Sequence, residues 1–566
     1  MKKLMMHSTP DLTPDFLRFG LLCNSLTLEK WQAETIKTLV NGGMQLHLVV
    51  VNDNQTDKTH FRDKIQHYNY SRLLFNFWSR FIFRPESKQG VDISTIIGNC
   101  IQIRCKTVAK GVFNIFDNQT IELIKQEKLD FLLRFGFNII KGEILNCTTY
   151  GVWSFHHDDE EVIRGGPPAF WEVYKPIDTN GVILQKLTDS LDKGLILKKI
   201  HFRTIKHSYK ANLNQAYFGS TFMPLSVCRD ILNGNYCEAI STSQVKVIHP
   251  PDNTRMVKFI LKMGYRRIQF HLKMLFRQED WVTGIIHQSG ASYINDSVQN
   301  ISPKQIYWLP KPTSSCYTAD PFVIDYQGDT LVFFELYDYA TGKGVISMVK
   351  ASENFQTFHE VLSSENHFSF PFVLEHKQSL YCIPESFESN GIQLYQYDNQ
   401  LNKLIFVRTL LDGIQAIDPV LFEYDGLWWL LITLKDQPSV HLYAYYANNP
   451  FGQFLPHANN PVKSSIFDAR SAGKPFTFNG KLIRPAQDCG KDYGMAVILN
   501  EITQLTSTSF KEIPFQTLKP GPEWPFHDGL HTFNSNLDYT VIDAKRFTFT
   551  WSGFKNQLLS KLKIRR

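Results

Sequence analysis

Residues 320–335 read DPFVIDYQGDTLVFFE, two runs of aromatic and β-branched residues joined by the turn Gln327-Gly328-Asp329. This pattern predicts a β-hairpin, because such residues favour strands and glycine favours the tight turn between them. Near copies begin at residues 370, 418, 474 and 531. The first four copies carry a proline at the same place, with spacings of 50, 48 and 56 residues. Repeats of this length with several strands each are typical of propeller blades, so five copies predict five blades.

Around these repeats, the chain divides into four segments that differ in composition and hydrophobic pattern. We expect an all-β five-bladed propeller over residues 281–546, followed by a basic C-terminal tail over 547–566. Residues 211–280 are expected to form a helical basic connector, because apolar residues recur there at helical spacing among lysines and arginines. Residues 15–210 begin with the order strand, helix, strand.

The segment over residues 15–210 is predicted to be an α/β domain of the Rossmann type. An apolar run over 19–23 is followed by a helix over 28–39 and by the continuous apolar run 46–51. A strand that is apolar without alternation is buried on both faces, which is typical of a parallel sheet. The predicted fold class is therefore an α/β domain joined to an all-β propeller.

The composition indicates a globular protein with more than one domain. The chain has 566 residues, and 13% of them are aromatic, which favours β-rich packing. Its net charge of +6 gives no argument for nucleic acid as a partner. The nine cysteines include no Cys-x-x-Cys pair, which argues against a zinc ribbon or a disulfide framework. We see no signal peptide and no apolar stretch of about 18 residues, so we expect a cytoplasmic protein.

The helix expected over residues 255–277 leaves two interpretations open. It combines apolar positions at helical spacing with seven lysines and arginines. One interpretation is a helix that lies on an anionic membrane surface, with the protein peripheral to the inner face of the membrane, or that grips an acidic partner. The other is a linker helix between domains, and it is favoured because runs of charge on helices are usually solvated faces.

Four motifs follow one another in the α/β segment: GVWSFHH at 151–157, RGGPPAFW at 164–171, GVILQ at 181–185 and LDKGLIL at 191–197. Their order resembles the core of the folate-dependent formyltransferases, a family that includes methionyl-tRNA and amino-sugar formyltransferases. In that family a strand ending in Asn-x-His leads to an Arg-Gly loop, a G-V-T-x-x strand and an L-D-x-G turn. The resemblance covers residues 15–205 and implies a formyltransferase-like fold with 10-formyltetrahydrofolate as cofactor.

The resemblance also implies roles for individual residues. His156 would move protons between the attacking amine and the leaving folate nitrogen, and Asp192 would orient it. Ser154 stands where the family has asparagine, and the loss of one oxyanion donor typically costs ~3 kcal/mol of activation free energy. A fold that is retained with a vestigial site is therefore the alternative. The remaining implied substrate or cofactor contacts are Phe135, Gly136, Arg164, Gly165 and Gly166.

The sequence HHDD at residues 156–159 also contains ligand types that metals prefer. Successive residues of an extended segment point to opposite faces, so these four side chains are poorly placed to close on one ion. We therefore predict no metal at this place.

Polar residues recur near the expected inner ends of the blades, where the central channel of a propeller would open. We expect them to converge on one funnel. They are Asp320, Glu335, Glu385, Asp418, Arg470, Arg484, Gln487, Asp488 and His531.

The second half resembles the five-bladed propellers of several glycoside hydrolases. It is more similar to the amino-terminal propeller of plant glucosamine inositolphosphorylceramide transferases, on the motifs FVLE at 372–375, IPES at 383–386 and RPAQD at 484–488. Three interpretations of the funnel stay open. The acidic residues could cap local backbone, could bind a glycan or nucleotide sugar, or could hydrolyse a glycoside with Asp320, Asp418 and Glu385 as base, orienting group and acid.

The leading functional prediction is transfer of a formyl group from 10-formyltetrahydrofolate to an amino sugar or glycoconjugate in surface-polysaccharide biosynthesis. The propeller would hold the acceptor, an amino-sugar nucleotide or glycoconjugate. The alternative is a propeller that acts as a glycosidase, is associated with a glycosyltransferase or binds glycans without catalysis, beside a vestigial formyltransferase domain.

Overall fold

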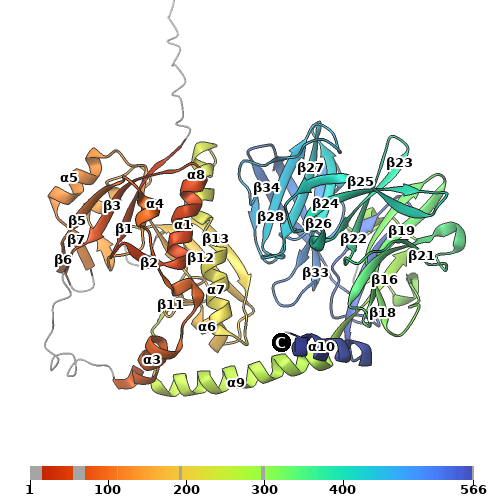
Figure 1. The fold of residues 1–566 in the computed structure, drawn as a ribbon, viewed down its shortest axis with the longest axis horizontal. Coiled ribbons are helices and arrows are strands. Elements are labelled where there is room, and N and C mark those ends of the chain that lie inside the picture. Colours follow the sequence, from red (N-terminus) through yellow and green to blue (C-terminus); the bar gives the residue numbers. More distant parts are fainter. Residues whose placement is uncertain are drawn as a thin grey trace, which may run out of the picture. The chain divides into compact units, whose positions relative to one another are not determined.

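The computed structural model describes residues 16–54, 70–110, 113–189, 194–241, 243–294 and 300–563. The chain folds into two compact units, each described here by itself (Figure 1). Unit 1 comprises the residues up to 175 together with 180–200 and 209–259. Unit 2 comprises the residues from 260 onward and the short segments 176–179 and 201–208. The division falls inside the long helix α9 (Asn253–Phe276).

In its described residues, unit 1 is built on an eight-stranded sheet with the order β14-β13-β12-β10-β8-β1-β3-β5. Strands β10, β8, β1, β3 and β5 are parallel to one another, while β12 runs antiparallel to β10 and β14 runs antiparallel to β13. The strands of this sheet are β1 (Arg18–Cys23), β3 (Gln45–Asn52), β5 (Ile101–Cys105), β8 (Phe131–Arg134), β10 (Val152–His156), β12 (Thr179–Lys186), β13 (Leu195–Arg203) and β14 (Ala239–Ile240). The apolar runs at 19–23 and 46–51 form β1 and β3, so the predicted parallel pair is confirmed.

Helices and short strand pairs complete unit 1. The helix α1 (Lys30–Asn41) buries Trp31, Ile36 and Leu39, and it forms between β1 and β3 as the sequence predicts. The other helices are α3 (Leu73–Phe77), α4 (Ser94–Ile97), α5 (Asn118–Gln126), α6 (Phe170–Tyr174), α7 (Tyr209–Gly219) and α8 (Met223–Leu232). The short strands are β2 (Thr27–Glu29), β4 (Gly90–Asp92), β6 (Thr107–Lys110), β7 (Phe113–Phe116), β9 (Ile139–Lys141), β11 (Arg164–Gly165) and β15 (Val247–Ile248).

Among its described residues, unit 2 contains five small antiparallel sheets, which we call blades 1 to 5. Blade 1 is β18 (Cys316–Tyr326), β19 (Asp329–Asp338), β20 (Lys343–Lys350) and β21 (His359–Leu362). Blade 2 is β22 (Ser369–His376), β23 (Ser379–Glu385), β24 (Gly391–Asp398) and β25 (Lys403–Asp412). Blade 3 is β26 (Ala416–Tyr424), β27 (Leu427–Leu434), β28 (His441–Ala447), β29 (Leu455–Pro456) and β30 (Lys463–Ser464). Blade 4 is β31 (Phe476–Phe478), β32 (Lys481–Asp488), β33 (Ala496–Leu505) and β34 (Phe510–Leu518).

Blade 5 combines strands from the two ends of unit 2. Its order is β17-β16-β36-β35, with β16 (Gln278–Ile286), β17 (Ile306–Trp308), β35 (Phe533–Ser535) and β36 (Thr540–Thr548). The ladder between β16 and β36 runs from Gln278 opposite Thr548 to Ile286 opposite Thr540. This pairing closes the series of blades into a propeller. Each of the five predicted repeats contributes the first two strands of a sheet, or the last two in blade 5, so the repeat prediction is confirmed.

Three of the repeat prolines, Pro321, Pro371 and Pro419, lie inside strands and not at strand starts. Asp320, Phe370 and Asp418 precede them and adopt positive φ of 54°, 42° and 46° inside β18, β22 and β26. The strand register shifts at each of the three places. A proline cannot donate to the ladder, so it is accommodated in a bulge, and the bulge redirects the residue before it.

Two helices accompany the blades of unit 2. The helix expected over 255–277 is confirmed as α9. Within the basic C-terminal tail expected over 547–566, residues Trp551–Lys563 form the helix α10. Phe554 of α10 packs against Phe276 at the end of α9, with 5.4 Å between ring centroids. None of the helices in the described residues is long and apolar enough to span a membrane.

Candidate functional site

In unit 1, Ser154 lies inside the sheet and is bound to a neighbouring strand. Its hydroxyl accepts a hydrogen bond from Nη1 of Arg134 at 2.8 Å, across the β8–β10 pair. Arg134 also donates through Nη2 to the carbonyl groups of Phe137 and Asn138. Ser154 therefore links two neighbouring strands.

His156 and His157 follow one another but lie in different surroundings. His156 ends β10, its side chain is 32% exposed, and its Nε2 lies 3.7 Å from the carboxylate of Asp158. His157 is buried among Trp31 and Tyr217, and burial holds its pKa well below the ordinary value. Asp192, the expected partner of His156, lies outside the described residues.

The other implied contacts of unit 1 have visible structural roles. Gly165 adopts φ +117°, and a Cβ there would lie 2.1 Å from the carbonyl oxygen of Ile248. Gly136 passes so close to the end of β1 that a Cβ would lie 2.5 Å from the backbone of Asn24. Arg164 and His156 both line a small pocket, while Phe135 packs its ring on Trp31. Gly166 precedes a cis proline. Of the residues in this set that the structure describes, His156 and Arg164 line the same pocket, and the catalytic or binding roles of the whole set stay predictions.

In unit 2, five acidic residues gather near the inner strands of the propeller, and we call them the carboxylate cluster. All five are nearly inaccessible to solvent. They come from four different blades, and the charges of the other four all raise the pKa of Glu335. The members are Asp320 on β18, Glu335 on β19, Glu385 on β23, Asp418 on β26 and Asp543 on β36.

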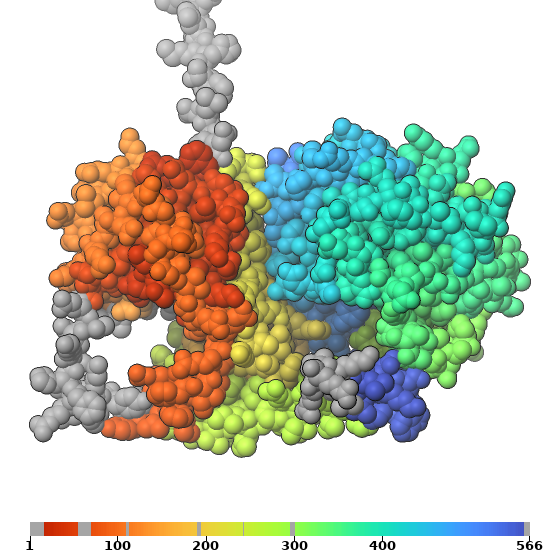
Figure 2. Space-filling model, in the orientation of Figure 1, coloured from red at the N-terminus to blue at the C-terminus, as the bar shows by residue number. Residues whose placement is uncertain are grey.

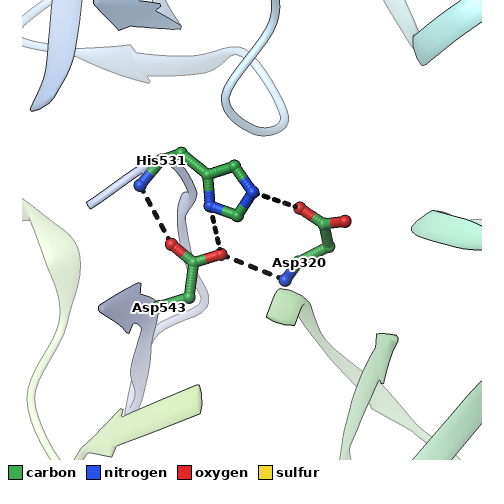
Figure 3. A group of neighbouring side chains, drawn as sticks. All are labelled: Asp320, His531 and Asp543. Carbon is green, nitrogen blue, oxygen red and sulfur yellow. Dashed lines mark hydrogen bonds and ion pairs between the residues drawn. The ribbon is translucent and has the colours of Figure 1, made fainter. Parts of the chain in front are cut away.

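His531 bridges two members of the cluster (Figure 3). Its Nδ1 lies 2.6 Å from Asp543 and its Nε2 lies 3.2 Å from Asp320. Asp543 also accepts hydrogen bonds from the backbone N–H groups of His531, Thr532 and Asp320. The imidazole ring stacks on Trp281 with 3.9 Å between centroids.

Arg470 holds the other side of the cluster. Its Nε donates to Asp418 at 2.6 Å, and its Nη2 lies 3.9 Å from Glu385. Gln487 donates to the same carboxylate of Asp418 at 2.8 Å. The guanidinium group also lies over the ring of Tyr493 at 4.9 Å. The cluster is therefore a network with fixed directions, in which one arginine and one histidine balance several carboxyl groups.

Burial and neighbouring charges shift the pKa values of the cluster residues and of His531 in different directions. It raises the pKa of Asp320 to about 7, although His531 opposes the rise. Burial and neighbouring carboxylates hold the pKa of Glu335 and of Glu385 well above the ordinary value. Burial alone would lower the pKa of His531, but Asp543 and Asp320 outweigh it and raise that pKa. The same ion pair lowers the pKa of Asp543 against the effect of burial.

Asp320, His531 and Asp543 lie close enough together to be ligands of one metal ion. Both ring nitrogens of His531 already face carboxylate oxygens, and the raised pKa favours the protonated ring. A protonated imidazole has no lone pair for a metal. The ring therefore fits a hydrogen-bonded position between the side chains of Asp543 and Asp320 better than a metal site.

Seven of the nine predicted funnel residues meet in this network, and two do not. Arg484 forms a buried ion pair with Glu512 and donates to the carbonyl group of Asp468. Asp488 accepts from the backbone N–H of Gly490. Sequence reasoning missed Asp543, Tyr493 and Trp281, and no local motif marked them.

A cavity of about 580 Å³ opens beside the cluster, and we call it the tyrosine pocket. Tyr317, Tyr337 and Tyr339 form its aromatic wall, and their ring centroids lie 4.7 to 5.7 Å apart. Arg277, at the end of α9, and Asn556 of α10 also line it. Glu335 stands two residues before Tyr337 on β19, on the same face of the strand. The pocket and the carboxylate cluster thus follow one another along blade 1.

Residues 308–524 match the family model described as glucosamine inositolphosphorylceramide transferase 1, N-terminal. This span holds most of the site just described. Glucosamine inositolphosphorylceramide transferase 1 of Oryza sativa subsp. japonica is 34% identical over 210 residues, which are 35% of this chain and 28% of that protein. The enzyme of the same name from Arabidopsis thaliana is 32% identical over 260 residues, 43% of this chain and 32% of that protein. The chain spans about three tenths of the length of these relatives.

Among solved structures, the family 117 glycoside hydrolase Zg3597 of Zobellia galactanivorans is similar at a TM-score of 0.31 and 13% identity, over 49% of this chain and 92% of that one. Formyltransferase structures reach TM-scores of 0.27 and 0.26. The resemblance of the second half to the plant propeller is supported by the family match, and the formyltransferase resemblance of unit 1 is not confirmed.

The predicted formyl transfer from folate to an amino sugar is wrong. The family match and the curated relatives all point to glycosyl-transferase-related proteins, and they fit the alternative of a glycan-related propeller. The prediction rested on the motif around His156, where Ser154 is held by Arg134. Binding of 10-formyltetrahydrofolate itself is tested by none of these findings and stays a prediction.

Proposed function

We propose that unit 2 binds a glycoconjugate that carries an amino sugar, as the ligand-holding part of a transferase-type enzyme. The observation that carries the proposal is the tyrosine pocket beside the carboxylate cluster. Tyr317, Tyr337 and the cluster residues from Asp320 to Asp418 lie inside the span matched by the family model. The relatives are named for glucosamine and inositolphosphorylceramide, which supports this class of ligand.

The chemistry of the pocket suits such a ligand. Its volume lies within the roughly 300–1,000 Å³ that is usual for ligand sites. Tyrosine rings offer flat apolar surface and a hydroxyl at one edge, which matches the alternating C–H and hydroxyl character of a sugar. Arg277 offers a cation for a phosphate, and Glu279 offers a carboxylate for an ammonium group.

The test is calorimetric titration of the full chain with glucosaminyl inositol phosphate and, for comparison, with a galactose disaccharide. We expect binding of the first and a loss of about tenfold in affinity for Tyr337→Ala, the value of one aromatic contact and its buried area. Tyr307→Ala is the matched control, since Tyr307 of β17 is 39% exposed and lies outside the pocket. Equal affinity for both sugars, or equal losses in both variants, would overturn the proposal.

A second candidate is chemistry on a glycosidic bond at Glu385 and Asp418. Glu385 has a raised pKa and can hold a proton, while its neighbour Asp418 is paired with Arg470. A carboxyl group with a raised pKa can serve as an acid, and a neighbouring carboxyl group held by an arginine could serve beside it. Incubation with the same glycoconjugate should then release or transfer a sugar, and Glu385→Gln should abolish turnover while leaving binding in place. Turnover that survives in Glu385→Gln would exclude this candidate.

A further inference from the structure

The helix α9 has two apolar faces, and only one of them is buried. Met256 and Phe259 are buried. Val257, Leu261, Tyr265, Ile268 and Leu272 are spaced by three or four residues, which places them on one side of the helix. Their exposed fractions are 46%, 68%, 62%, 62% and 50%. This exposed apolar face runs from Val257 to Leu272.

Basic residues border the exposed apolar face. Residues 253–277 contain seven lysines and arginines and no aspartate or glutamate. Lys258 and Lys273 are exposed and lie on the same flank of the helix. An apolar stripe beside a purely basic flank is the pattern of a helix that lies in the interface of an anionic bilayer.

The helix α10 extends this surface within unit 2. Its Phe554 packs on Phe276 of α9, and its Trp551, Leu558 and Leu559 are 70%, 42% and 55% exposed. Residues 551–566 hold five lysines and arginines and no acidic residue. Tryptophan side chains are enriched at the level of the lipid headgroups, because the ring is apolar and its N–H group is polar. Figure 2 shows the yellow-green atoms of α9 at the surface on the face drawn.

We propose that α9 and α10 bind the surface of an anionic lipid bilayer. The exposed apolar face would enter the headgroup region, and the basic flank would pair with lipid phosphates and carboxylates. The basic flank is complementary to an acidic partner. The apolar stripe over residues 257–272 is about 23 Å long and favours a bilayer over a nucleic acid, because a nucleic acid would leave the stripe uncovered. This proposal stands on surfaces outside the tyrosine pocket's aromatic wall and does not depend on the ligand proposed above.

The test is co-sedimentation of the full chain with vesicles of phosphatidylcholine, with and without phosphatidylserine. We expect binding only to the vesicles that contain phosphatidylserine, and a decrease in binding as salt is raised. Lys258→Gln combined with Lys273→Gln should weaken binding by about twenty-five-fold, because each charge near an anionic surface contributes about fivefold. Leu261→Asn combined with Ile268→Asn should weaken it without changing the salt dependence.

The controls carry the same chemical changes away from the helices. Leu537 is 85% exposed and Lys511 is exposed, so Leu537→Asn and Lys511→Gln should bind vesicles like the unchanged chain. Quenching of tryptophan fluorescence by brominated lipids should fall in Trp551→Phe. Equal binding to neutral and anionic vesicles, no binding to anionic vesicles, or unchanged vesicle binding in the α9 variants would overturn the proposal.

Discussion

Replacement of Asp543 by asparagine tests whether the carboxylate cluster is a network of charges that stabilises the propeller. Asp543 faces the imidazole of His531 at 2.6 Å and accepts from three backbone N–H groups. The amide of the replacing asparagine would place an N–H donor against one of these donors, and the negative charge would be lost. Breaking a buried pair on one side costs about 3–5 kcal/mol, which for a unit of this size lowers the melting temperature by roughly 10 °C.

The pH dependence of this loss has a defined sign. The raised pKa of His531 means that its contribution is present below the ordinary value of 6.5 and is lost as pH rises through the folded-state pKa. The lowered pKa of Asp543 means that its contribution is present above 3.8 and is lost as pH falls through the folded-state pKa. The difference between the unchanged chain and Asp543→Asn should therefore be largest between pH 3.8 and 6.5.

Scanning calorimetry of the full chain at several pH values measures this difference. Asp425→Asn is the control, because Asp425 is an exposed turn residue with φ 49°, a conformation that asparagine also tolerates. It should change the free energy of unfolding by less than about 0.5 kcal/mol. A loss below about 1 kcal/mol for Asp543→Asn, or a loss that is the same at about pH 5 and about pH 9, would refute the reasoning.

Two further predictions concern the stability of unit 2 and of unit 1, one each. Glu335→Gln should leave stability unchanged near the ordinary carboxyl pKa of 4.5 and raise it in alkaline buffer, because the raised pKa makes the unchanged chain lose stability as pH rises from 4.5 toward the folded-state pKa. The melting temperature followed against pH checks this, and an unaltered pH slope in the variant would contradict it. Gly165→Ala should destabilise unit 1 by about 3 kcal/mol or more, because of φ +117° and the contact with Ile248. Calorimetry should show this shift in a transition that Asp543→Asn leaves unmoved.

The propeller could be predicted from the sequence because the residues that pair in each repeat are close together in the chain. Each blade begins with a hairpin whose two strands are joined by a short turn, so a repeat of apolar runs is visible without knowledge of the fold. The same holds for Asp320 and Asp418, which stand at equivalent places in their repeats. The cluster residue Asp543 could not be found in this way, because β36 pairs with β16, more than 250 residues earlier in the chain.

Arg484 was wrongly predicted to join the funnel, and the sequence alone could have shown why it does not. Side chains on a strand alternate between its two faces. Arg484 and Gln487 are three residues apart on β32, so they lie on opposite faces. Gln487 reaches Asp418 in the cluster, and Arg484 reaches Glu512 on the other face. Asp488, next to Gln487, also leaves the cluster. The role of Ser154 could not be foreseen, because its partner Arg134 comes from a neighbouring strand.

The two proposals meet at the tyrosine pocket. Arg277 at the end of α9 and Asn556 of α10 line the pocket together with Tyr337 of blade 1. If the two helices lie on a bilayer, a glycoconjugate carried by a lipid would meet the pocket at the level of the headgroups, and its sugars would extend along β19 toward Glu335. Binding of a soluble headgroup would then be insensitive to Leu261→Asn and Ile268→Asn, while binding of the same headgroup on a vesicle would be weakened by them. Equal effects on both forms would show that the helices and the pocket do not act on one ligand.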